Sequence, residues 1–267
     1  MTYFTGLLLP ESPLVCFRRA ETLPGYVLSD DQVQVLLSDP YRTPKASIFD
    51  DHWVAEGDQK HHNSCAGWGG ANASSKAAYL AGQNPTGTVY SGSYPYSFAN
   101  RGQDQGAALQ DVMQALETNG FGVPASECDA NSIYRNQCSK FDAEAKSLLG
   151  LSYYAAATQA EVNSALVKDH PVVVCVNVDT SVYVNYNGQG LVPAFAGKGN
   201  HCIHVDDLRW NASARQYEYR QVGNWGLNWG NKGTGWCTWK SFQQTIGYHM
   251  FYVCASVQVS SPSQPQP

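Results

Sequence analysis

The chain has 267 residues and a net charge of −5 at pH 7, from 17 basic and 22 acidic side chains. That length is enough for one large domain or for two lobes with a buried core. Charged residues make up 15% and aromatic residues 12%, a balance typical of a packed globular protein and not of a disordered one. The acidic balance and the lack of a basic stripe argue against a nucleic-acid-binding protein.

The first residues do not have the pattern of a targeting segment. Residues 1–17 are apolar, but Pro10 and Pro13 interrupt them and no basic leader precedes them. No run reaches the roughly 20 apolar residues of a membrane helix. We therefore expect no secretory signal and no membrane contact. We expect a protein that folds in the cytoplasm, and association with a virion or another assembly is left open.

The first part of the chain predicts an arm, a helix and a loop. Pro residues and Ser-Asp turns punctuate residues 1–45, which we expect to lie as an arm on the main body. Small residues over 65–81 predict a helix, whose glycines each cost roughly 1 kcal/mol relative to alanine and require close packing. Residues 82–103 are rich in Gly, Pro and Tyr and predict a long loop.

Two further helices are predicted. The first runs from residue 104 or 105 to 119, has one apolar face, and ends before Gly120, which is a natural stop. The second begins at Thr158, has Glu161 three residues later as in a capping box, and ends before Pro171.

β-Branched and aromatic residues dominate the rest of the chain. They predict strands over 172–178, 201–210, 216–223, 234–240 and 248–259. Helices followed by strands predict an α+β protein with a helical lobe, a β-rich lobe and a site in the cleft between them. We expect an arm, the helical lobe, the β-rich lobe and a Ser/Pro/Gln-rich tail at residues 1–45, 46–150, 151–259 and 260–267.

The eight cysteines are scattered and do not have the dense spacing of a disulfide scaffold. No CxxC pair supports zinc, so we expect no metal site. Cys175, Cys202 and Cys254 lie in apolar runs and are expected to be small core residues. Cys128 and Cys138 bracket a short polar loop and are the pair expected to form a disulfide under oxidising conditions.

One cysteine lies in a pattern that indicates nucleophilic chemistry. Gln59 precedes Cys65 at a short distance, and His201 stands far downstream at the start of a strand-like run. A thiol needs a base to become a nucleophile at neutral pH, and an amide nearby can stabilise an oxyanion. The three residue types predict a cysteine hydrolase or a relic of one.

Several segments resemble the papain family of cysteine peptidases. Residues 59–65 (QKHHNSC) resemble the nucleophile motif, 200–203 (NHCI) the Asn-His-Ala-Val strand, and 225–230 (WGLNWG) the Trp-Gly-x-x-Trp-Gly turn. Residues 106–120 and 158–192 resemble a helix and a helix–strand–loop unit of bacterial members.

The similar segments occur in the family's order over about 55–255, which makes the set more specific than any one motif. The resemblance is to bacterial or phage-type members. It implies a papain-like two-lobed fold with a nucleophile helix in the helical lobe and a β-barrel-like second lobe that carries the histidine. It also implies cleavage of peptide or protein substrates without a metal or an organic cofactor.

The resemblance assigns a role to each candidate residue. Cys65 is the nucleophile, favoured as an anion at a helix N-terminus, and the competing interpretation is a buried structural cysteine. Gln59 is the oxyanion donor, and the alternative is a solvated loop residue. His201 is the base in preference to His204, because residues three apart on a strand point to opposite faces. Trp225 shields the base from water.

The residue that orients His201 is the weak point of the match. The family has Asn two residues before the first Trp of the turn, where this chain has Gly223. A one-residue bulge would let Asn224 accept from His201, and we expect this. Asp206 and Asp207 are alternative partners.

Two other departures concern the loop and the arm. His61 and His62 lie beside the nucleophile, and an exposed polar loop explains them better than a metal site. Many family members have a Cys at the position of His62, so their usual bridge is absent here, which fits a reducing compartment. The arm over 1–45 looks too short for the inhibitory prodomain of the family.

The leading hypothesis is a papain-like cysteine endopeptidase. A catalytically silent papain-like module is the alternative from another class, favoured by Gly223. It would bind an assembly partner through the 1–45 arm or the 260–267 tail. A CHAP-type cell-wall amidopeptidase is the enzymatic alternative, because it uses a similar Cys-His pair.

Overall fold

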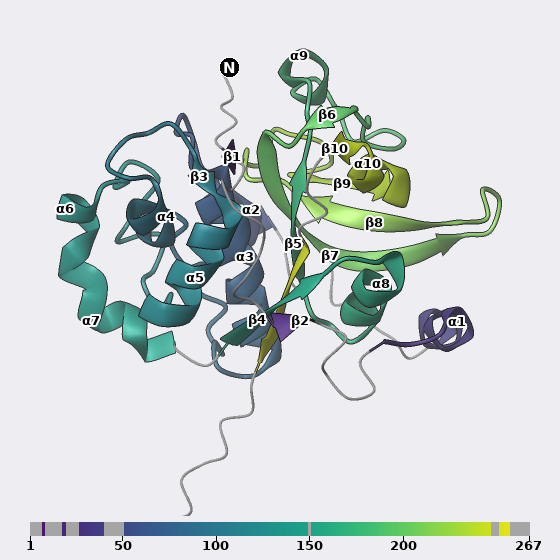
Figure 1. The fold of residues 1–267 in the computed structure, drawn as a ribbon, viewed down its shortest axis with the longest axis horizontal. Coiled ribbons are helices and arrows are strands. Elements are labelled where there is room, and N and C mark those ends of the chain that lie inside the picture. The colour runs from purple at the N-terminus through teal and green to yellow at the C-terminus, as the bar shows by residue number, and fades with distance from the viewer. Residues whose placement is uncertain are drawn as a thin grey trace, which may run out of the picture.

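A computed structural model of the chain describes residues 7–8, 18–19, 27–39, 51–148, 151–246 and 251–256. Figure 1 shows a group of helices beside a curved sheet, with helix α3 (Cys65–Leu80) between the two. The chain is therefore α+β, as predicted. None of the helices in these ranges combines the length and apolar character that a membrane crossing requires.

The helical lobe lies on one side of α3 (Figure 1). Its other α-helices are α2 Asp51–Glu56, α4 Ser93–Ala99, α5 Leu109–Asn119, α6 Arg135–Cys138 and α7 Asp142–Ala145. Two 3-10 turns, η3 Ser139–Phe141 and η4 Lys146–Leu148, flank α7. A two-residue strand, β3 (Ala107–Ala108), pairs in parallel with β1 (Leu7–Leu8) of the arm.

The second lobe is built on a sheet that has seven strands among the described residues. Their order is β2 Arg18–Arg19, β4 Leu151–Ala156, β11 Phe251–Ser256, β5 Val172–Val176, β7 His201–Asn211, β8 Gln216–Val222 and β9 Thr234–Thr238. All neighbours are antiparallel except β2 and β4. The smaller elements are the parallel pair β6 Gly197–Lys198 and β10 Thr245–Ile246, and helices α8 Gln159–Val167, α9 Thr180–Tyr183 and α10 Trp239–Gln243.

The central strands are buried on both faces, which explains their continuous apolar sequence. Val172 and Val174 belong to one core cluster, whereas the alternate residue Cys175 belongs to a second cluster that includes residues of α3 and α5. Cys202 and Cys254 lie in this second cluster. The prediction that these three cysteines are small core residues is confirmed.

Helix α3 packs unusually closely against both of its neighbours. A Cβ atom added to Gly67 would lie 2.2 Å from the carbonyl oxygen of Gly92, just before α4. A Cβ atom added to Gly69 would lie 2.9 Å from Sγ of Cys202 on β7. The glycines that weaken the helix are therefore what allows it to fit between the two lobes, as the sequence predicted.

Two predictions for the helical lobe were wrong. The segment 82–103 is not a continuous loop, because it contains α4. The helix predicted from residue 104 or 105 begins at Leu109, because Ala107 and Ala108 pair with the distant β1. Its predicted stop is confirmed, since Gly120 has a φ of 81°.

The predicted helix start in the second lobe is confirmed. Thr158 accepts a hydrogen bond from the backbone N–H of Glu161, and the Glu161 side chain accepts from the backbone N–H of Thr158. This reciprocal pair satisfies two backbone donors that the first turn leaves open.

The arm segment over residues 27–39 lies against the β-rich lobe. It forms α1 (Asp30–Ser38), which Figure 1 shows beside α8. The backbone N–H of Leu28 donates to the Ser164 hydroxyl at 2.8 Å, and the Tyr217 hydroxyl donates to Asp30 at 2.5 Å. The tail over 260–267 and the rest of the 1–45 arm, apart from β1 and β2, lie outside the described residues.

Candidate active site

Cys65 is the first residue of α3 and is fully buried. Ser64 is the N-cap residue, but its side chain makes no capping hydrogen bond. The open N–H groups of the first turn and the helix dipole stabilise an anion at this end of the helix. The helix start thus favours an anion, whereas the complete burial of the thiol opposes one, and the nucleophile role of Cys65 stays a prediction.

Asn224 connects three parts of the predicted site. Its Nδ2 lies 3.2 Å from Oε1 of Gln59, 3.0 Å from the carbonyl oxygen of Cys65 and 3.1 Å from that of Cys202, so its two hydrogens are shared among three acceptors. Cys202 directly follows His201 at the start of β7. One buried amide thus joins the start of the nucleophile helix, the candidate oxyanion donor and the strand that carries the candidate base.

Gln59 is fully buried, not solvated. Its Nε2 donates to the carbonyl oxygen of His62 at 2.7 Å, and its backbone N–H donates to the carbonyl oxygen of Asn224 at 2.9 Å. A side-chain amide nitrogen carries two hydrogens, so one of them is directed into this loop. These bonds fix the Gln59 side chain close to the start of α3.

His201 is also fully buried, among aromatic rings. The centroid of its ring lies 4.7 Å from that of Trp225, at an interplanar angle of 37°, and 6.0 Å from that of Tyr183. Burial lowers the pKa of His201 to about 3, so its imidazole is neutral at pH 7. The neutral imidazole is the form that accepts a proton, but the same burial makes it a weaker base than an exposed histidine.

The expected hydrogen bond from His201 to Asn224 is not formed. Neither ring nitrogen of His201, nor Oδ1 of Asn224, has a hydrogen-bond partner among the described residues. Gly223, at the position of the family's orienting Asn, is tightly packed, because a Cβ atom there would lie 2.9 Å from the ring of Trp229. The indole of Trp229 therefore excludes a larger side chain at this position.

The alternative partners are engaged elsewhere. Asp206 binds Lys76 at 2.8 Å and Arg220 at 2.5 Å, and all three side chains are largely buried. Asp207 accepts from the backbone N–H of Leu208 at 2.8 Å. Neither carboxylate is hydrogen-bonded to a ring nitrogen of His201.

The other histidines have different surroundings. His204 is buried, and burial lowers its pKa to about 3 against the opposing effect of Asp206. His62 is about a quarter exposed, and its Nδ1 lies 2.9 Å from Oδ2 of Asp104. This contact was not predicted, because 42 residues separate the two side chains and no motif links them.

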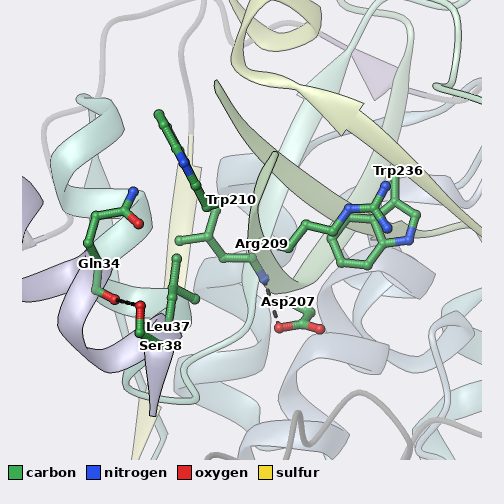
Figure 2. Close-up of a pocket in the computed structure, with 8 residues that line it drawn as sticks. Gln34, Leu37, Ser38, Asp207, Arg209, Trp210 and Trp236 are labelled. Atoms are coloured by element: carbon green, nitrogen blue, oxygen red, sulfur yellow. Dashed lines mark hydrogen bonds between the residues drawn. The ribbon is translucent and has the colours of Figure 1, made fainter. Parts of the chain in front are cut away.

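A cavity of about 470 Å³ lies away from these residues, between α1 and the sheet (Figure 2). Figure 2 shows Arg209 extended along the ring of Trp236, and its guanidinium carbon lies 3.9 Å from the ring centroid. The lining residues are Gln34, Leu37, Ser38, Asp207, Leu208, Arg209, Trp210 and Trp236. None of the predicted catalytic residues lines it.

Gln59, Cys65, His201 and Asn224 each have 0% of their surface exposed. A peptide cannot reach a thiol that has no contact with solvent. The arrangement is that of a closed site. Any chemistry at Cys65 requires the residues that cover its thiol to move first.

Solved structures that share this fold include cysteine proteases. Xylellain, a cysteine protease from Xylella fastidiosa, aligns with a TM-score of 0.61 and 18% identity over 92% of this chain and 100% of its own. Digestive procathepsin L 3 of Tenebrio molitor larval midgut aligns with a TM-score of 0.60 and 15% identity over 75% of this chain. The ragweed pollen cysteine protease Amb a 11, in its proform, gives the same three values.

The alignments cover 66% of the procathepsin and 61% of the ragweed protease, so the chain spans just under two thirds of these two proteins. No protein-family model and no curated protein matches the chain. The predicted papain-like fold is confirmed.

Proposed function

We propose that the chain is a papain-like cysteine endopeptidase, with Cys65 as nucleophile, His201 as general base and Gln59 as oxyanion donor. The observation that carries this proposal is the set of hydrogen bonds from Asn224, which joins Gln59 and Cys65 to the start of β7. The fold shared with known cysteine proteases supports it.

In the proposed reaction, neutral His201 accepts the proton of Cys65 and the thiolate attacks the peptide carbonyl. A side-chain N–H of Gln59 and the backbone N–H of Cys65 stabilise the resulting oxyanion. The imidazolium then protonates the leaving amine, and water hydrolyses the acyl-enzyme. These steps require no metal and no organic cofactor.

Hydrolysis of casein by the purified chain under reducing conditions tests the proposal. We expect cleavage by the wild type and none by Cys65→Ala, because that variant removes the nucleophile. Cleavage that survives in Cys65→Ala would overturn it. Purified cell walls serve as a second substrate, and cleavage of these alone would favour the CHAP-type amidopeptidase.

A silent papain-like module that serves as a binding subunit is the second candidate. Two observations favour it: the four candidate side chains are closed off from solvent, and the ring of His201 has no hydrogen-bond partner among the described residues. An epoxysuccinyl inhibitor separates the candidates. Covalent labelling of Cys65 supports the peptidase, and no labelling in reducing buffer supports the silent module.

We also propose that the protein functions in the cytoplasm, which is a reducing compartment. Six cysteines in the described part of the chain are free thiols: Cys128, Cys138, Cys175, Cys202, Cys237 and Cys254. Cys128 and Cys138 have sulfur atoms 3.2 Å apart without a covalent bond. Disulfides are rare in reducing compartments, which is consistent with this state. Binding of an assembly partner through the arm or the tail remains part of the second candidate.

A further inference from the structure

A network around Asp104 holds the loop that precedes Cys65. Oδ1 of Asp104 accepts from the backbone N–H of Asn63 and from the Tyr96 hydroxyl, both at 2.9 Å. Its Oδ2 lies 2.9 Å from Nδ1 of His62, and its backbone carbonyl accepts from Nδ2 of Asn63 at 2.8 Å. We call Asp104, His62, Asn63 and Tyr96 the Asp104 network.

One end of the Asp104 network is hydrogen-bonded to the predicted catalytic loop, residues 59–65. Asn63 is separated from Cys65 by Ser64 alone, and the carbonyl oxygen of His62 accepts from Nε2 of Gln59. The Asp104 contacts are therefore within two residues of the nucleophile, and they hold the carbonyl group that positions the candidate oxyanion donor.

The other end of the network is buried in the helical lobe. Tyr96 is fully buried in α4, and its hydroxyl also accepts from the backbone N–H of Gly106 at 3.1 Å. Burial, together with the charge of Asp104, raises the pKa of Tyr96, so its phenol remains a hydrogen-bond donor. The carboxylate thus connects the loop to a helix and to the segment that leads into β3.

The Asp104 network lies where many members of the papain family have a disulfide bridge. The papain family often has a bridged Cys at the position of His62, and this chain has none. Without the bridge, the hydrogen bonds to Asp104 attach residues 62 and 63 to the rest of the helical lobe.

We propose that Asp104 is a positioning residue, which holds residues 59–65 so that the Gln59 amide and the Cys65 N–H are directed at the same oxyanion. This inference rests on the proposed peptidase function. Donors that are already aligned stabilise the transition state without reorganisation, whereas a misplacement of about 1 Å can cost about 100-fold in rate.

Asp142 provides a matched control. It is a carboxylate of the same lobe that accepts from the Tyr94 hydroxyl at 3.0 Å and from Arg135 at 2.7 and 2.8 Å. It has no hydrogen bond to residues 59–65. Asp104→Ala and Asp142→Ala therefore remove comparable side-chain bonds, but only the first loosens the catalytic loop.

The test compares kcat, KM and Tm for the wild type, Asp104→Ala, Asp104→Asn and Asp142→Ala. We expect Asp104→Ala to lower kcat about 10- to 100-fold with KM changed less than about 3-fold. Asp104→Asn keeps an oxygen that accepts from Asn63 and Tyr96, so it should recover most of kcat. Unchanged kcat in Asp104→Ala, or a loss equal to that of Asp142→Ala, would overturn the proposal.

Amide hydrogen exchange of residues 59–65 gives a readout that does not depend on activity. Exchange should become faster in Asp104→Ala and remain unchanged in Asp142→Ala. If the wild type hydrolyses no peptide, the proposed function fails, but faster exchange still supports the anchoring role. Unchanged exchange in Asp104→Ala would refute that role whatever the activity.

Discussion

The imidazole of His201 is positioned by aromatic rings and not by a hydrogen-bonded amide. Tyr183 stacks on Trp229 at 4.9 Å, meets Trp225 edge-on at 5.1 Å and faces His201. A ring without a hydrogen-bond partner keeps its orientation only through such packing. Tyr183 and Trp225 therefore set the direction in which the nitrogens of His201 point.

We expect Tyr183→Leu to lower kcat/KM about 10- to 100-fold, because the ring of His201, the proposed base, loses packing that fixes its orientation. Tyr183→Phe, which keeps the ring, should stay near the wild-type value. Tyr186→Leu is the control, since Tyr186 also packs on Trp229, at 5.5 Å. Equal losses in Tyr183→Leu and Tyr186→Leu would indicate a general packing defect instead.

The Asn224 side chain donates to backbone carbonyl oxygens of two separate elements. Its replacement should therefore reduce stability as well as activity. Asn224→Ala leaves the buried carbonyl groups of Cys65 and Cys202 without this donor. We expect a loss of about 2–4 kcal/mol in the free energy of unfolding, measured by urea denaturation. Asn224→Asp should lose more, because it places a carboxylate beside two carbonyl oxygens. A variant Asn224→Ala as stable as the wild type would contradict this role.

At the scale of elements, a buried ionic group fastens α3 to the sheet. Lys76 of α3 and Arg220 of β8 both bind Asp206 of β7. Burial alone would raise the pKa of Asp206, but Arg220 and Lys76 outweigh it and lower the pKa, so the carboxylate is charged. The group fixes α3 against β7, the strand that carries His201.

We expect Asp206→Asn to cost about 3–5 kcal/mol in the free energy of unfolding, because it leaves two buried cations without their anion. Asp51→Asn is the control, since Asp51 pairs with the exposed Lys232 and should show no measurable loss. Urea denaturation of both variants decides the comparison. Equal stabilities would mean that the buried group does not hold the elements together.

The elements that the sequence predicted well are those with local signals. The capping box at Thr158 and the stop at Gly120 depend on neighbouring residues, and both are present. Helix α4 was missed because its Gly, Pro and Tyr content indicated a loop. Pro95 is the third residue of α4, in the first turn, where a missing N–H leaves no helical hydrogen bond unmade.

Non-local contacts explain what the sequence could not predict in the site. The motifs identified Gln59 and Cys65, which Asn224 joins at the start of α3, and the strand start that carries His201. The exclusion of a side chain at Gly223 depends on the ring of Trp229, which only the folded chain brings there. The Asp104 network is likewise invisible in the sequence, because no periodicity connects residue 104 to the nucleophile loop.

At the scale of the whole molecule, two buried neutral histidines make stability depend on pH. The pKa values of His201 and His204 are lowered from 6.5 to about 3 in the folded chain. Between pH 6.5 and about pH 3 the unfolded chain binds more protons than the folded chain. The contribution of the two histidines to the free energy of unfolding is therefore fully present above pH 6.5 and is lost as the pH falls.

We expect a slope of roughly 3 kcal/mol per pH unit between pH 6 and pH 4.5, from two protons taken up on unfolding. Burial also lowers the pKa of His170, so this residue makes the slope steeper. Urea denaturation at several pH values measures the slope, and proton uptake can be measured by calorimetry in buffers of different ionisation enthalpy. A stability that stays constant over this range would contradict the burial of the two rings.

The most direct measurement is the rate at which an epoxysuccinyl inhibitor labels Cys65 in the folded protein, with the labelled residue identified by mass spectrometry. The proposed pairing of thiol and imidazole predicts labelling of Cys65 in preference to the other cysteines, and a rate at least about 10-fold lower in His201→Ala. Absence of labelling at Cys65, or an equal rate in His201→Ala, would contradict it.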